Sequence, residues 1–338
     1  MDYELVRPLL TILIGGTLVI LGGLLFTNSV EYLASKYRIS STFIGAIISP
    51  ILTSLPELVV IIVALIHGGS AGSEISIGTI IGEPFMASTI VYSMLVIAGF
   101  IGYIKKRRDK PLLEPSRDLY VPFLTFSILF PLVLVPSFIR ALFVRIALAL
   151  VMLLAYFLYV FAVIRAGGEI IEENVEAVYF GKFMKSETYA AFVQVVFSIL
   201  LIYLGSERLV GGIVELSRII GISMQALSII VVPSVAALPE SVVGLVWAYK
   251  GRDTLALASV VGEKVLYSTF YPGVGMLVTC WCLDLASVFC VVYATAISLL
   301  MLYYVLRRRI GAEVAALGVA GYLLYCLTVF HVLKLGAV

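Results

Sequence analysis

The stretch TSLPELVV, residues Thr53 to Val60, places a proline and a glutamate inside a long apolar segment. The stretch AALPESVV, residues Ala236 to Val243, repeats the Leu-Pro-Glu triplet in a second apolar segment. A carboxylate in apolar surroundings is costly unless it is paired, protonated or bound to a cation. A proline removes a backbone hydrogen bond and bends or breaks a helix. The two triplets therefore predict a functional feature that is built twice.

The composition predicts a membrane protein. The chain has 338 residues, of which 62% are hydrophobic and 13% are charged, and a soluble domain of this size needs more polar residues to cover its surface. Apolar windows of roughly 18 residues or more recur along the chain, each long enough to cross about 30 Å of hydrocarbon. We predict an all-α integral membrane protein with ten transmembrane helices. The expected spans are 9–34, 40–66, 74–104, 119–137, 139–164, 189–216, 221–248, 253–280, 284–306 and 312–334.

Two regions of the chain repeat each other. TIIGEPFMAST at residues 79–89 aligns with SVVGEKVLYST at residues 259–269, and the two Leu-Pro-Glu triplets align in the same order. Five spans in each half force the second half to enter the membrane in the opposite direction, which is the inverted-repeat plan of secondary transporters. The predicted segments are a first half at 1–166, an acidic cytoplasmic linker at 167–187 and a second half at 188–338.

Lysine and arginine residues are unequally distributed between the two sides of the predicted bundle. Most of them, including the KKRRDK run at 105–110 and the arginines at 307–309, fall on one side. Positive residues gather on the cytoplasmic side, so both termini are expected outside the cytoplasm, in a protein of the plasma membrane. The net charge of +2 gives no indication of nucleic-acid binding. The expected partners are metal cations and membrane lipid, with a monomer as the transport unit.

Four glutamates are expected near the middles of spans two, three, seven and eight. One ionised side chain at that depth costs about 2.5–3.5 kcal/mol on insertion scales. Two symmetry-related pairs are therefore expected to be paired, protonated or bound to a cation. The structural alternative is a set of carboxylates that are hydrogen-bonded to helix ends. The four residues are Glu57, Glu83, Glu240 and Glu263.

Prolines beside these acids are expected to break the helices near the membrane midplane and to expose carbonyl oxygens. Carbonyl and carboxylate oxygens suit a hard cation such as Ca²⁺. Hydroxyl groups could add ligands, although back-bonding to their own helices is the alternative role. Gly78, Gly82 and Gly262 are expected to let these spans pack closely. The helix-breaking residues are Pro50, Pro56, Pro233 and Pro239. The candidate hydroxyl ligands are Thr53, Ser54, Ser88, Thr89, Ser268 and Thr269.

The TSLPE element, followed by a glycine-containing span, resembles the alpha repeats of the calcium/cation antiporter superfamily, which includes sodium/calcium exchangers. The likeness extends over the whole chain. It implies alternating-access exchange of Ca²⁺ for Na⁺, H⁺ or K⁺, in which spans one and six rock against a core of spans two, three, seven and eight. It also implies that Glu57 and Glu240 are the Ca²⁺ ligands and that Thr53 and Ser54 lend oxygens. A transporter of this kind is no enzyme and needs no cofactor.

The chain departs from the superfamily pattern at the expected site. In span three the family usually has Gly-Ser-Asn, whereas residues 82–84 of this chain read GEP. In span eight residues 262–264 read GEK, and in the second repeat the Thr-Ser pair is replaced by alanines at 236 and 237. Several oxygens that hold sodium in the exchangers are therefore missing, while two carboxylates are added. We hypothesise that Glu83 and Glu263 carry protons, and that Lys264 compensates some of the negative charge if it points inward.

The sequence thus predicts a secondary active antiporter that exchanges Ca²⁺ for Na⁺ or H⁺. A cation-selective channel is one alternative, since it would also need buried oxygens, but convergent glutamates favour tight occupancy over rapid release. An antiporter for Mg²⁺ or Mn²⁺ coupled to H⁺ is another, because both ions use oxygen ligands. An intramembrane enzyme lacks a recognisable nucleophile or metal set, and a protein that binds ions without moving them is a further alternative.

Overall fold

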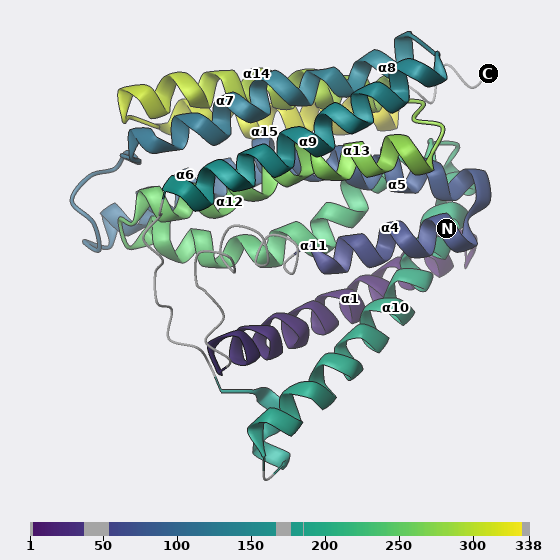
Figure 1. The fold of residues 1–338 in the computed structure, drawn as a ribbon, viewed down its shortest axis with the longest axis horizontal. Coiled ribbons are helices and arrows are strands. Elements are labelled where there is room, and N and C mark those ends of the chain that lie inside the picture. The colour runs from purple at the N-terminus through teal and green to yellow at the C-terminus, as the bar shows by residue number, and fades with distance from the viewer. Residues whose placement is uncertain (1–2, 37–53, 167–176, 185, 333–338) are drawn as a thin grey trace. The chain divides into compact units, whose positions relative to one another are not determined.

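Helices make up the regular structure of the chain, and among the described residues an isolated bridge joins Leu113 to Ile310. The computed structural model describes residues 3–36, 54–166, 177–184 and 186–332 (Figure 1). Pro50 and Thr53, which are predicted to break a helix and to bind the cation, lie outside the described residues. The chain divides into unit 1, Met1–Gly72 with Phe157–Ile219, and unit 2, Ser73–Tyr156 with Ile220–Val338.

Three helices form most of unit 1: α1 (Tyr3–Lys36), α4 (Leu55–His67) and α10 (Glu187–Ile220). Gly15 of α1 and Gly205 of α10 mark a close crossing, because a Cβ on Gly15 would lie 2.8 Å from the carbonyl oxygen of Gly205. Small residues let helix backbones approach closely inside a membrane, where dispersion contacts replace the hydrophobic effect. Farther along the same two helices, Gln194 Nε2 donates to the carbonyl oxygen of Leu25 at 2.8 Å.

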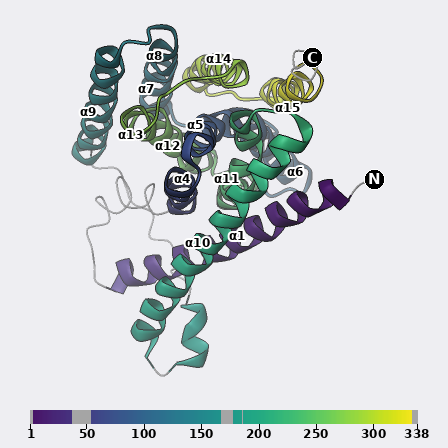
Figure 2. The ribbon, with the colours of Figure 1, turned by 90° about the vertical axis from the view of Figure 1, so that its right-hand side faces the viewer.

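Unit 2 holds the larger helical bundle, which Figure 2 shows partly end-on. Helix α7 packs against α12 and α14, helix α11 packs against α6 and α12, and helix α15 packs against α6 and a short π-helix, η2. The core between these helices includes Tyr92, Leu95, Phe123 and Met301, all of them buried. The α-helices are α5 (Gly69–Met86), α6 (Tyr92–Ile104), α7 (Tyr120–Leu129), α8 (Val135–Phe138), α9 (Leu142–Ala166), α11 (Met224–Tyr249), α12 (Asp253–Ser268), α13 (Phe270–Val278), α14 (Leu285–Arg307) and α15 (Ala312–Leu327). The 3₁₀ and π segments are η2 (Ala87–Val91), η3 (Arg117–Leu119), η4 (Phe130–Leu134), η5 (Tyr179–Phe183) and η6 (Thr328–Val332).

The starts of α11 and α14 are joined by one polar network. Ser223 caps α11 by accepting from the backbone N–H of Ala226, and Asp284 caps α14 by accepting from the N–H of Ser287 at 2.7 Å. The two caps contact each other, since the Ser223 hydroxyl donates to the Asp284 carboxylate. Gln225 accepts from the Asp284 N–H at 2.8 Å. The orphan N–H groups of two helices are thus satisfied together, which fixes their ends side by side.

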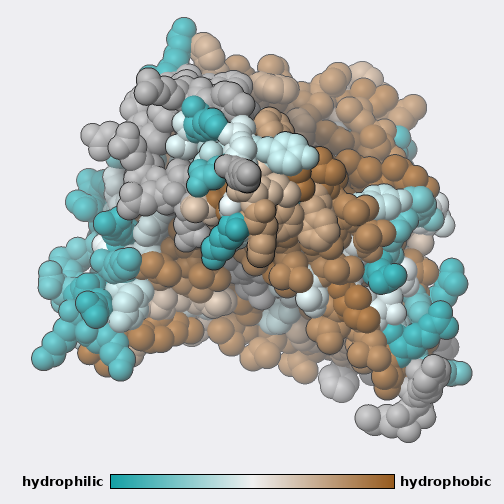
Figure 3. All heavy atoms as spheres, turned by 90° about the horizontal axis from the view of Figure 1, so that it is seen from below, coloured by the Kyte–Doolittle hydropathy of each residue, from teal (hydrophilic) through white to brown (hydrophobic). Residues whose placement is uncertain are grey.

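The described helices are long and apolar enough for a membrane. Seven of the described helical stretches, some of which join adjacent labelled segments such as α5, η2 and α6, have the length and composition of a membrane span. The number rises to eight if the bent helix α11 is counted as one span. Large apolar side chains point outward, among them Phe138, Phe143 and Phe183, which are 73%, 81% and 84% exposed. Figure 3 shows one such face, where apolar side chains form a broad central area and hydrophilic ones gather toward its two sides. Outward apolar surface of this extent fits contact with lipid.

Two of the predicted spans differ from single continuous helices. The span predicted at 40–66 is described only from Ser54, and its helical segment α4 is a shorter apolar helix. The span predicted at 253–280 consists of α12 and α13, which are separated at Thr269. Thr269 has φ −132° and ψ −73°, far from helical values, so the chain changes direction inside an apolar segment.

Helix α5 packs on α11 through glycines. A Cβ on Gly82 would lie 2.7 Å from Ile229 Cα and 2.8 Å from its carbonyl oxygen, and a Cβ on Gly78 would lie 2.4 Å from the carbonyl oxygen of Gln225. The close packing expected at these two glycines is therefore present. Among the described residues, nothing lies within 4 Å of a Cβ added to Gly262, the repeat-related counterpart of Gly82.

A buried ion pair fixes the loop after α6 to the start of α12. The Arg108 guanidinium donates to both carboxylate oxygens of Asp253, at 2.8 and 2.9 Å, and the two side chains are 5% and 6% exposed. Arg108 also donates to the carbonyl oxygen of Ala248, and the N–H of Glu114 donates to Asp253. The planar guanidinium matches the carboxylate in two parallel bonds, so the loop is held in one arrangement.

We expect Asp253→Ala to destabilise the protein by about 3–5 kcal/mol, because it leaves the Arg108 charge buried without its counter-charge. Thermal unfolding of the purified protein in detergent measures the effect as a lower midpoint. Glu114→Ala is the matched control, since it removes an exposed partner of Lys110 in the same loop and should leave the midpoint unchanged. Equal midpoints for the two variants would contradict the prediction.

We expect Gly82→Ala to lower the unfolding midpoint, because the new methyl group meets backbone atoms of Ile229 that cannot move alone. Gly262→Ala is the control in the other half. Its new methyl group meets no atom of the described residues within 4 Å, and it replaces glycine inside a helix, so its stability should stay the same or rise by up to about 1 kcal/mol. A Gly82→Ala protein as stable as the Gly262→Ala protein would show that the α5–α11 contact is loose.

Candidate functional site

Glu57 lies in the first turn of α4, directly after Pro56, which occupies one of the first two helical positions. Proline is favoured there because the N–H it lacks has no partner within the helix. The Glu57 side chain is fully buried. The first turn of a helix carries a partial positive charge, which favours a carboxylate at this position. Pro56 therefore begins a helix at the point where the sequence predicts an interruption, and it places the acid at the helix end.

The other three glutamates belong to unit 2. Glu83 lies on α5 with 2% of its surface exposed, and Glu263 lies on α12 and is partly buried. Glu240 belongs to α11, where the arms Met224–Ala236 and Ser241–Tyr249 differ in direction by 60°. Pro239 and Glu240 lie in the segment between these arms, and their side chains are outside the description.

Lys264 is a fully buried cation among the described residues of unit 2. Its side chain is fully buried on α12, and its ammonium donates to Ser88 Oγ at 2.7 Å and to Ser298 Oγ at 2.8 Å. The carboxylate of Glu83 acts on it electrostatically. The ammonium therefore points into the bundle, as the charge-compensating role requires. The two hydroxyls come from η2 and α14, so three separate elements meet at one nitrogen.

The hydroxyls that the sequence predicts as ligands fall into two groups. Ser88 accepts from Lys264, and so its oxygen already faces a cation. Thr89 donates to the carbonyl oxygen of Phe85, while Ser268 and Thr269 donate to that of Val265. Their protons are thus used within their own helices, which is the back-bonding alternative, and their lone pairs are left for another donor or a cation. Ser54 is buried at the start of α4.

Irregular backbone occurs at the same place in both repeats. Thr89 lies within the π-helix η2, and its aligned counterpart Thr269 separates α12 from α13. Pro84 lies inside α5 three residues before η2, and the backbone bond that it removes lies in the turn before it. π-Turns of this kind are frequent at functional sites, and non-helical backbone at membrane depth is tolerated where it lines a cavity or is buried in protein.

Three residues around Lys264 were not predicted from the sequence: Ser298, Tyr92 and Phe126. Ser298 is the second hydroxyl partner, and the rings of Tyr92 and Phe126 lie 4.8 and 4.1 Å from the ammonium, measured to the ring centroids. A serine well inside the apolar span 284–306 was the available signal for the first. Nothing in the sequence distinguishes the two aromatic residues from the many others that pack helices.

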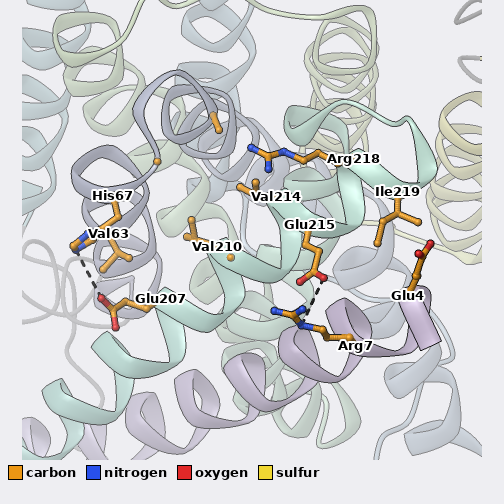
Figure 4. A pocket seen from close by; sticks show the side chains of 13 residues that line it. Glu4, Arg7, Val63, His67, Glu207, Val210, Val214, Glu215, Arg218 and Ile219 are labelled. Atoms are coloured by element: carbon orange, nitrogen blue, oxygen red, sulfur yellow. Dashed lines mark ion pairs between the residues drawn. The ribbon is translucent and has the colours of Figure 1, made fainter. Parts of the chain in front are cut away.

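Unit 1 contains an open cavity of about 920 Å³ between α1, α4 and α10 (Figure 4). Two ion pairs lie on its wall: Arg7 with Glu215 at 3.7 Å, and His67 with Glu207 at 3.8 Å. The cavity includes His67 at the C-terminal end of α4, whereas Glu57 is ten residues earlier, or about 15 Å along the helix axis. The cavity is therefore at the opposite end of α4 from the predicted Ca²⁺ ligand. Within the described residues, no three His, Cys, Asp or Glu side chains are grouped to hold a metal.

Several solved structures resemble this one. A structure described as the H⁺/Ca²⁺ exchanger CAX gives a TM-score of 0.74 at 18% identity, covering 97% of this chain and 85% of that chain. Native YfkE gives 0.71 at 16% identity, covering 95% and 92%. The sodium-calcium exchanger NCX_Mj gives 0.57 at 21% identity, covering 96% and 99%. The likeness at these identities concerns the fold.

Sequence comparison with curated proteins gives no match. The family model described as sodium/calcium exchanger protein matches residues 7–165 and 190–331. Together with the similar structures, this match confirms the predicted family, an all-α membrane fold that matches that of the exchangers, and a transporter in place of an enzyme. The chain belongs to the sodium/calcium exchanger protein family.

Proposed function

We propose that the protein exchanges Ca²⁺ for H⁺ across the membrane. The observation that carries the proposal is the set of acids placed in apolar helices, of which Glu57 and Glu83 are almost completely buried. A carboxylate away from water takes up a proton or a cation, because the bare charge is too costly. Exchange between those two occupants is antiport.

Glu57 and Glu240 are proposed as the Ca²⁺ ligands. Ca²⁺ takes six to eight oxygen ligands and accepts carboxylates in one- or two-oxygen contacts. The start of α4 places the Glu57 carboxylate close in the chain to buried Ser54, and the bend of α11 lies at Glu240. Thr53 and Ser54, with Thr89, Ser268 and Thr269, are the hydroxyls proposed to add oxygens, whereas Ser88 accepts from Lys264.

Glu83 and Glu263 are proposed as the proton carriers. They occupy the positions where the family pattern lacks an acid, and they lie on α5 and α12 within unit 2. Protons are favoured over sodium as the counter-ion because a carboxylate holds a proton without further ligands, whereas sodium needs several oxygens. The greater structural similarity to an H⁺/Ca²⁺ exchanger than to a sodium-calcium exchanger points in the same direction.

The remaining elements of the proposal concern the membrane and the assembly. The uneven distribution of Lys and Arg supports an orientation with both termini outside the cytoplasm, and the plasma membrane is proposed as the location. The proposed division of the chain is a first half at 1–166, a linker at 167–187 and a second half at 188–338. During transport, spans one and six are proposed to move against a core of spans two, three, seven and eight. A monomer is proposed as the transport unit.

We expect purified protein in liposomes to take up ⁴⁵Ca²⁺ when the interior is acidic and no sodium is present, because protons leaving the vesicle drive Ca²⁺ inward. Separate imposed Na⁺ and K⁺ gradients test the other counter-ions. Uptake that needs a Na⁺ gradient would replace H⁺ by Na⁺ in the proposal. Uptake without any counterflow indicates a channel, and competition by Mg²⁺ or Mn²⁺ identifies another divalent substrate.

Glu57→Gln should reduce this uptake roughly 10- to 100-fold, because it removes a charged contact worth about 1.5–3 kcal/mol to the bound ion. Glu114→Gln is the control, since its carboxylate lies in the exposed loop beside Lys110. Both proteins should elute as a single species in detergent. Unchanged uptake by a well-folded Glu57→Gln protein would remove Glu57 from the site.

A further inference from the structure

A lysine is fully buried inside the bundle of unit 2, and its place is more specific than charge balance requires. Lys264 Nζ lies 2.7 Å from Ser88 Oγ and 2.8 Å from Ser298 Oγ. The rings of Tyr92 and Phe126 present their faces at 4.8 and 4.1 Å. The contacts come from η2, α14, α6 and α7, so the position is formed by tertiary packing around the nitrogen.

Every one of these contacts favours a positive charge. A hydroxyl oxygen accepts from the ammonium, and the face of an aromatic ring is its negative region. A lysine that only neutralised a glutamate would need one carboxylate and no such shell. Here Glu83 supplies a negative charge nearby, while two hydroxyls and two rings enclose the ammonium itself. Oxygens and ring faces around one point also describe a site for a small monovalent cation.

We infer that this pocket, formed by Ser88, Ser298, Tyr92 and Phe126, is a monovalent-cation site that Lys264 fills permanently. The ammonium stands where a free alkali ion would otherwise bind, tethered by its own side chain. Because the lysine is part of the chain, it does not dissociate to either side of the membrane as a bound ion does. Its consequence for transport is that no alkali ion has to bind to keep the site neutral, and this consequence rests on the proposed function.

Lys264→Ala tests the inference because it empties the site and leaves the shell in place. We expect Na⁺ or K⁺ to bind there, so both ions should raise the unfolding midpoint of this variant above its value in choline. Lys264→Met fills the same space without charge, and its midpoint should be insensitive to the salt, as should that of the wild-type protein. This thermal measurement does not depend on whether the protein transports Ca²⁺.

The transport measurement uses the same three proteins in liposomes with an acidic interior. In choline, Lys264→Ala should be about tenfold slower than wild type, and Na⁺ or K⁺ on both sides should restore most of the rate. Lys264→Met should be slow in every salt. The double variant Lys264→Ala with Ser298→Ala should need higher Na⁺ for the same restoration, because one oxygen of the shell is gone. Lys250→Ala, outside the bundle core, is the control for loss of a positive charge.

The results separate the two proposals. No Ca²⁺ exchange by the wild type refutes the proposed function, while the salt dependence of the unfolding midpoint still decides the inference. A folded Lys264→Ala protein that alkali ions neither stabilise nor activate overturns the inference, as does one that transports like the wild type in choline. If Lys264→Ala is monodisperse only in Na⁺ or K⁺, the inference is supported. If neither it nor Lys264→Ser is monodisperse in any salt, the inference is overturned, because an alkali ion should stabilise the emptied shell.

Discussion

Charge held away from water is the constraint on which the rest of this structure depends. Glu57, Glu83 and Lys264 are almost completely buried in a chain that exposes many large apolar side chains. Such groups persist only where oppositely charged or hydrogen-bonding partners are already in position. The Lys264 ammonium meets this condition through hydroxyls and ring faces from four elements, so the helices of unit 2 pack around a charge as well as around apolar side chains.

The departures from regular helix follow from the same constraint. The π-helix η2, the separation at Thr269 and the 60° bend of α11 all lie beside the repeat motifs. Each irregularity leaves backbone N–H or C=O groups without their helical partners or changes the direction of a side chain. Inside a membrane such backbone groups need partners from the protein or from a bound ion, because the lipid supplies none. Regular helices elsewhere, such as α9 and α14, carry the apolar surface and need no such feature.

The chain belongs to the sodium/calcium exchanger family, but the residues of its proposed ion site differ from the family pattern. The family fold brings acids into the membrane, while the GEP and GEK segments add two carboxylates and a lysine. In the proposed cycle the acids exchange Ca²⁺ against protons, and the lysine stays in its pocket between the hydroxyls and the aromatic rings.

The sequence by itself determined the membrane class, the two repeated halves and the family, because hydropathy and a repeated Leu-Pro-Glu motif are local and need no knowledge of packing. It also placed Lys264 among the acids. Only the tertiary structure decided that Ser298, Tyr92 and Phe126 surround that lysine, that Pro56 begins a helix, and that Gly82 packs on a neighbouring backbone. These facts depend on which helices become neighbours, and residues far apart in the chain leave no mark of their contacts in a single sequence.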